Sequence, residues 1–215
     1  MALPVGGRAD KSGNKYEQNW VIYNLLKVIQ EKLSYVIIEP LGDYEDGVDL
    51  WIVYKNGKNE FQQCKARNGS RDYWQFGDIN NRGLWNKWKK HLDRDINNIA
   101  SLVSPLPFTL LEDIISRALN NDNNPNDFYN IQIKGSGKDT TNLFNDICKQ
   151  LKFDTNTNNG LNSAYQYFKK IRIHQWPDFE STEMILDIID SLFIGNPNIV
   201  IALLRNFIVE KNIYG

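Results

Sequence analysis

Cysteine and histidine are scarce in this sequence, which has two of each among 215 residues. Cys64 and Cys148 form neither a zinc-binding spacing nor a disulfide framework, and with only His91 and His174 beside them a structural zinc site is not expected. No apolar run of about 18 residues occurs, and the N-terminus lacks the apolar stretch of a secretory signal. We therefore expect a reduced, cytoplasmic protein without a membrane partner.

An excess of one charge is also missing, because the formal net charge is -1. The overall composition is that of an ordinary globular protein, with 41% hydrophobic and 24% charged residues. Residues 65–94, however, carry eight basic and three acidic residues with five aromatic residues between them. This pattern suits a phosphate backbone, and it equally suits a solvated helix face whose aromatic rings enter the core. The predicted DNA contacts are Arg67, Arg71, Arg82, Lys87, Lys89 and Lys90.

Apolar periodicity predicts alternating helices and strands in the first half of the chain. Asn56-Gly57 is a strong signal for a two-residue hairpin turn, so we expect the strands on either side of it to pair antiparallel. The order αβββαβ predicts an α/β sandwich with one mixed sheet. The expected helices are 15–33 and 84–97, and the expected strands are 35–39, 48–54, 60–67 and 99–104.

The second half of the sequence is mainly helical. An Asn-rich loop over 120–130 interrupts the helical pattern. We therefore divide the chain at the start of this loop, into a domain over 1–119 and a mainly helical extension over 120–215. The last predicted helix is apolar almost all round and the sequence stops soon after it, from which we expect a segment of a longer protein. The expected helices are 109–119, 142–151, 161–168, 181–192 and 198–211, with a short strand over 170–174.

Three polar residues of the predicted hairpin form a candidate site. Gln63 and Lys65 share one face of their strand, roughly 6–7 Å apart. A two-residue turn places Asp49 opposite Cys64, and therefore beside both Gln63 and Lys65. The competing interpretation is that these are surface groups on an exposed strand.

The chemistry of these residues suits a divalent cation and a phosphodiester. Mg²⁺ prefers oxygen ligands, which the Asp49 carboxylate, the Gln63 amide and the Cys64 backbone carbonyl can supply. Lys65 can stabilise an attacking hydroxide and the phosphate. Glu17 or Glu39 can add a further carboxylate.

The sequence motifs resemble those of the PD-(D/E)xK superfamily of restriction-endonuclease-like nucleases, in the Mrr-type branch that has Gln before x-Lys. More narrowly, they are similar to the N-terminal nuclease domain of bacterial antiviral sensor ATPases of the STAND or NACHT type. The motifs that carry the resemblance are Gly6-Gly7-Arg8-Ala9-Asp10, Tyr16-Glu17, Glu39, Gly47-Val48-Asp49 and Gln63-Cys64-Lys65.

The resemblance implies a restriction-endonuclease-like fold and an endodeoxyribonuclease that cleaves double-stranded DNA with little sequence preference. It implies Mg²⁺ as cofactor, with Mn²⁺ as a substitute, and Asp49, Gln63 and Lys65 as the catalytic core, assisted by Glu17 and Glu39. It also implies activation by self-association, as a tetramer or another homo-oligomer, and a downstream ATPase. The alternative is a catalytically degenerate nucleic-acid-binding or oligomerisation module with the same fold.

Overall fold

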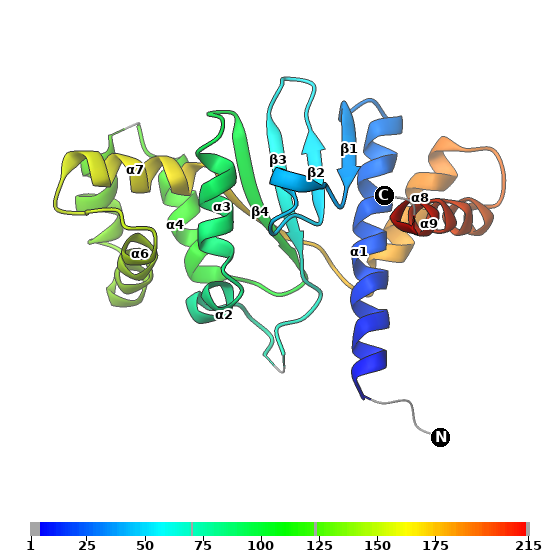
Figure 1. Cartoon of the computed structure of the whole chain (residues 1–215), viewed down its shortest axis with the longest axis horizontal. Coiled ribbons are helices and arrows are strands. Elements are labelled where there is room, and N and C mark those ends of the chain that lie inside the picture. Colours follow the sequence, from blue (N-terminus) through cyan, green and yellow to red (C-terminus); the bar gives the residue numbers. More distant parts are fainter. Residues whose placement is uncertain (1–4, 70, 123, 214–215) are drawn as a thin grey trace. The chain divides into compact units, whose positions relative to one another are not determined.

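The computed structural model describes residues 5–69, 71–122 and 124–213, and the side chains of residues 15–69, 71–122 and 124–209 (Figure 1). The first part of the chain contains α1 (Val5–Ile29), β1 (Tyr35–Ile38), η1 (Gly42–Tyr44), β2 (Leu50–Val53), β3 (Asn59–Cys64), α2 (Phe76–Asn81), α3 (Leu84–Leu92) and β4 (Asn98–Ser104). The remainder contains α4 (Thr109–Leu119), α5 (Pro125–Asp127), η2 (Phe128–Ile133), α6 (Lys138–Gln150), α7 (Asn158–Lys169), β5 (Ile171–Gln175), α8 (Ser181–Leu192) and α9 (Pro197–Ile213).

The strands form a five-stranded sheet in the order β1-β2-β3-β4-β5. β1, β2 and β3 pair antiparallel. Backbone hydrogen bonds from Ala100 to Lys170 and from Trp176 to Ser104 advance in the same direction along β4 and β5, so these two strands run parallel. The predicted α/β class with one mixed sheet is therefore confirmed.

The hairpin between β2 and β3 closes differently from the prediction. Tyr54 donates its backbone N–H to Lys58 at 2.9 Å, so the turn has three residues and contains Gly57 at a φ of 80°. Leu50 pairs with Gln62 and Val53 with Asn59, which moves every pair by one residue from the predicted register. The predicted two-residue turn is wrong because a left-handed glycine also serves a three-residue turn.

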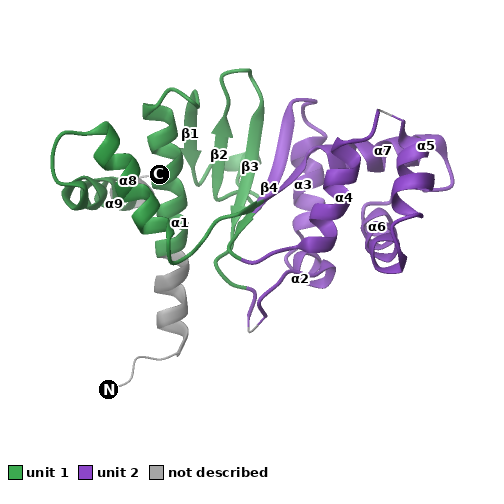
Figure 2. Cartoon of the chain, turned by 180° about the vertical axis from the view of Figure 1, so that it is seen from behind, with its two compact units in different colours: residues 1–67, 103–105, 174–215 green, residues 68–102, 106–173 purple. Residues whose placement is uncertain are grey.

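The chain forms two compact units, which Figure 2 shows in separate colours. Unit 1 comprises residues 1–67, 103–105 and 174–215, and unit 2 comprises residues 68–102 and 106–173. Both units contain residues from before and after residue 119, so the predicted boundary there does not separate them. The core of unit 1 includes Trp20, Ile52 and Ile185, and the core of unit 2 is built around aromatic residues such as Trp85 and Phe144.

The helix bounds agree best with prediction in the second half of the chain. α4 and α8 begin and end at the predicted residues. α1 instead starts at Val5, before the predicted start at Lys15, and α2 and α5 lie in predicted loops. Among the described residues, no single helix is long and apolar enough to cross a membrane, although the bent pair of α8 and α9 together reaches that length and composition.

Candidate functional site

The predicted site residues Asp49, Gln63 and Lys65 converge in unit 1. Asp49 directly precedes β2, and its Oδ2 accepts the Cys64 backbone N–H at 2.7 Å. The same oxygen accepts a hydrogen bond from the Gln63 amide nitrogen and lies 3.4 Å from Lys65 Nζ. Gln63 is buried, whereas the Asp49 and Lys65 side chains are 22% and 35% exposed. A ligand in solution can therefore reach the charged groups without unfolding the hairpin.

Glu17 on α1 supplies a second carboxylate to this cluster. Its burial, and then the negative charge of Asp49, raise the pKa of Glu17 to about 7, while Lys65 opposes that rise. Near neutral pH the Glu17 carboxyl is therefore only partly ionised. A bound divalent cation would favour the ionised form of both carboxylates.

Glu39 lies at the end of β1 with a left-handed backbone conformation, at a φ of 45°. This conformation costs about 1–2 kcal/mol for a residue with a Cβ, and the following proline disfavours it further. The Glu39 backbone N–H donates to the Asp49 carbonyl at 3.0 Å, which links the end of β1 to the site. The charge of Glu39 also contributes to the raised pKa of Glu17.

The donor groups fit a magnesium ion only in part. Within the described part of the chain, no group of three His, Cys, Asp or Glu side chains is placed to hold a metal ion. Mg²⁺, however, is commonly bound by one or two carboxylates together with water and phosphate oxygens. Asp49 and Glu17 can supply the two carboxylates. Gln63 directs its amide nitrogen toward Asp49, so a half-turn of the amide is needed before its oxygen faces a cation there.

Cys64 is a packing residue. Its side chain is 3% exposed and belongs to the core of unit 1. Burial raises the pKa of the Cys64 thiol well above its usual range, so the sulfur stays protonated and is a poor nucleophile. Its contribution to the cluster is the backbone N–H that binds Asp49.

Most of the basic residues predicted to contact DNA lie in unit 2, and several have acidic or aromatic partners there. Arg71 pairs with Asp78 at 2.8 Å, Lys89 pairs with Asp93, and the Arg82 guanidinium lies 5.0 Å from the Trp74 ring. Trp85 and Trp88 of the same segment are fully buried. These contacts favour the second interpretation of the segment, a solvated face with its aromatic rings in the core.

A buried polar network on the other face of β3 was not predicted from the sequence. Glu60 is 2% exposed, and its carboxylate binds His174, Tyr54 and Gln62. Burial alone would raise the pKa of Glu60, but the hydrogen bond and charge of His174 dominate with the other donors and lower it to about 2. Trp20 on α1 donates to Gln62 at 2.7 Å and closes the network. The alternation of Glu60, Gln62 and Cys64 was the available signal for a shared strand face.

No protein-family model and no curated protein matches this chain. Solved structures of the Acinetobacter baumannii Cap4 SAVED/CARF-domain containing receptor do match. The receptor with the cyclic trinucleotide 3'3'3'-cAAA is 15% identical with a TM-score of 0.51, over 97% of this chain and 44% of the receptor chain. The receptor with 2'3'3'-cAAA has the same identity and TM-score, over 97% of this chain and 41% of the receptor chain.

These neighbours correct the resemblance drawn from the motifs. They are described as receptors, two of them with a cyclic trinucleotide, and none of those named is described as a nuclease. The expectations of a PD-(D/E)xK nuclease domain and of a magnesium-dependent endodeoxyribonuclease are therefore wrong, and binding of double-stranded DNA is not supported. A short Asp…Gln-x-Lys motif places polar groups on adjacent strands, and that geometry alone does not specify a reaction. At 15% identity this chain, which spans less than half of these receptors, shares their fold.

Proposed function

We propose that this chain is a nucleotide-responsive module of a multidomain bacterial defence receptor, and that the cluster around Asp49 binds a phosphate group through Mg²⁺ and Lys65. The receptors that share the fold hold cyclic trinucleotides, whose nucleosides are joined by phosphodiesters. The context of antiviral defence expected from the motifs agrees with this proposal, although the nuclease they suggested does not. Of the two hypotheses from the sequence, the non-catalytic binding module agrees better with these neighbours.

The convergence of a carboxylate and an ammonium at the adjoining ends of β2 and β3 is the observation that carries the proposal. Asp49 Oδ2 and Lys65 Nζ lie 3.4 Å apart and both are partly exposed. A carboxylate can hold the cation and a lysine can neutralise a phosphate oxygen as a point charge. The protein supplies too few oxygen ligands for a closed cage, so phosphate oxygens would complete the coordination of the cation.

The ionisation of Glu17 should depend on whether the proposed site holds a cation. Its raised pKa keeps part of the population protonated near neutral pH. Binding of Mg²⁺ must therefore release protons, because the cation stabilises the carboxylate form. Mn²⁺, which takes similar oxygen ligands, should substitute.

Calorimetric titration with a cyclic triadenylate tests the proposal. We expect binding in Mg²⁺ that is lost in EDTA, and an affinity that is weaker by at least about ten-fold in Lys65→Met, because a hydrogen bond to a charged group contributes about 1.5–3 kcal/mol. Lys58→Met, at the exposed residue directly after the hairpin turn, is the matched control and should bind like the wild type. Equal affinity in Mg²⁺ and EDTA, or no binding at all, would contradict the proposal.

The larger assembly is proposed on the same basis. The receptors of this fold are longer than this chain, which supports a further domain in the same protein. A downstream ATPase, a tetramer or other homo-oligomer, and the finer restriction-endonuclease-like arrangement of the sheet stay predictions. Light scattering on the full-length protein, with and without cyclic triadenylate, measures the predicted self-association.

A further inference from the structure

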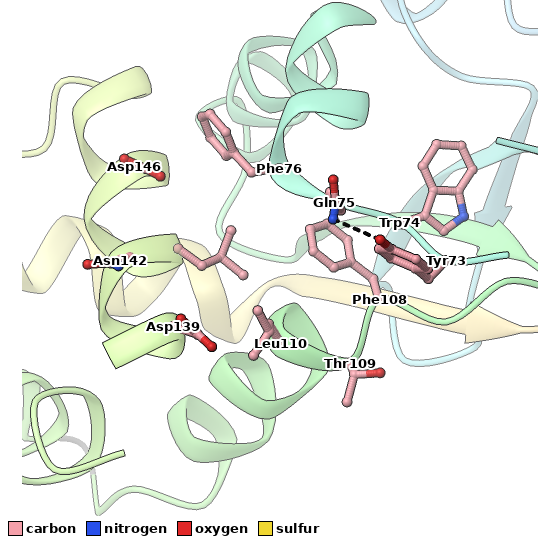
Figure 3. A pocket seen from close by; sticks show the side chains of 11 residues that line it. Tyr73, Trp74, Gln75, Phe76, Phe108, Thr109, Leu110, Asp139, Asn142 and Asp146 are labelled. Carbon is pink, nitrogen blue, oxygen red and sulfur yellow. Dashed lines mark hydrogen bonds between the residues drawn. The ribbon is translucent and has the colours of Figure 1, made fainter. Parts of the chain in front are cut away.

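Unit 2 contains a cavity of about 370 Å³ that is separate from the cluster around Asp49. Figure 3 shows its walls, which come from the segment of Tyr73–Phe76, from the start of α4 and from α6. The volume falls in the range of small-molecule sites, roughly 300–1,000 Å³.

One wall of the cavity is aromatic and is held in place by the core. Tyr73 is 45% exposed and offers its ring to an occupant, while Trp74 and Phe108, which also line the cavity, are 2% exposed. Phe76 stacks on Trp85 with ring centroids 5.9 Å apart, and Phe108 lies 6.4 Å from the same ring. The Trp74 backbone N–H also binds the Pro107 carbonyl at 2.8 Å. The apolar wall is therefore formed before any ligand arrives.

The facing wall is acidic. Asp139, Asn142 and Asp146 are exposed on α6 at spacings of three and four residues, which places them on one face of the helix. Figure 3 shows them across the cavity from the aromatic residues. No lysine, arginine or histidine occurs among the described residues that line the cavity. An anionic ligand would meet two carboxylates without a compensating cation, so the cavity disfavours phosphates.

We propose that this cavity binds a small organic cation with a flat apolar ring, of the arylalkylamine class. The ring would lie against Tyr73 and Leu110, which is 41% exposed. The ammonium group would face Asp139 and Asp146, and it is also attracted by the negative faces of aromatic rings. Apolar burial and charge complementarity thus select the same class of ligand.

The test compares three ligands of nearly equal shape, namely phenethylamine, phenethyl alcohol and phenylacetate. Titrations followed by NMR should show the amine binding most tightly and the carboxylate least. Replacing both aspartates, Asp139→Asn with Asp146→Asn, should weaken amine binding about ten-fold, since each exposed ion pair contributes about a two- to five-fold effect. Asp190→Asn on the exposed side of α8 is the control and should change nothing. Tyr73→Ala should weaken the amine about two- to five-fold.

Three results would overturn the proposal. The first is that phenylacetate binds as tightly as phenethylamine. The second is that the double aspartate variant binds the amine like the wild type. The third is that no amine binds at millimolar concentration. Binding of an arginine-rich peptide in the absence of any amine binding would instead assign the cavity to a protein partner. Amine binding should be the same in EDTA and in Mg²⁺, which separates this site from the one at Asp49.

Discussion

Replacement of Glu17 by glutamine should make the protein more stable at high pH and leave it unchanged at low pH. The pKa of Glu17 is about 7 in the folded protein, against 4.5 for an ordinary glutamate. Between these two values the folded state holds a proton that the unfolded state has lost. The free energy of unfolding of the wild type must therefore fall as the pH rises from 4.5 to 7.

The magnitude follows from the size of the shift. Each unit of pKa difference corresponds to about 1.4 kcal/mol, so the difference between 4.5 and about 7 amounts to at most about 3 kcal/mol. Glu17 is partly exposed, and screening by solvent lowers this to about 1–3 kcal/mol. Glutamine keeps the shape of the neutral carboxyl but cannot ionise beside Asp49. Glu17→Gln should therefore gain that amount above pH 7.

Urea unfolding of both proteins at several values between pH 4.5 and pH 8 measures the difference directly. We expect the two stability curves to meet at the acidic end and to separate toward pH 8. Addition of Mg²⁺ should flatten the curve of the wild type, because the cation compensates the charge of Glu17. A Glu17→Gln protein that is less stable than the wild type at pH 8 would refute the reasoning, since it would mean that the ionised Glu17 is stabilising.

Three further substitutions test other parts of the structure. Glu60→Gln should lower the free energy of unfolding at pH 7 by about 2–3 kcal/mol, because His174 loses its charged partner. Urea unfolding should show that this loss shrinks as the pH falls from 4.5 toward 2, because Glu60 itself becomes protonated there. Asp78→Ala should cost about 1 kcal/mol in thermal unfolding, because the carboxylate caps α2 through the Gln75 N–H at 2.9 Å. Gly160→Ala should cost about 1–3 kcal/mol by the same measurement, since its Cβ would lie 2.0 Å from the Asp154 carbonyl, whereas Gly77→Ala meets nothing within 4 Å and serves as the control.

Local patterns were sufficient for elements with clear periodicity and clear ends. α4 and α8 were predicted at their observed bounds, because regular apolar spacing runs between residues that start or stop a helix. α1 was predicted too short, because Gly6, Gly7 and Gly13 suggested a loop where the chain is helical. The hairpin register was missed by one residue, since the sequence does not distinguish a two-residue from a three-residue turn around Gly57.

In the candidate site, too, contacts between neighbouring parts of the sequence were predictable and contacts between distant parts were not. Asp49, Gln63 and Lys65 were brought together correctly because two adjacent strands carry them. The pairing of Glu60 with His174 joins residues that are 114 positions apart in the sequence, and no local pattern predicted it. The inferred reaction was wrong for a related reason, since the motif specifies which groups meet but not which ligand they receive.

Paramagnetic broadening by Mn²⁺ in amide NMR spectra tests the proposed cation site most directly. Mn²⁺ held by Asp49 and Glu17 should first broaden the backbone signals of Cys64 and Lys65, whose strand end contacts Asp49. The broadening should disappear in Asp49→Asn and should be reversed by excess Mg²⁺. Uniform broadening, or broadening confined to the acidic loop at Glu45 and Asp46, would contradict a cation site at Asp49.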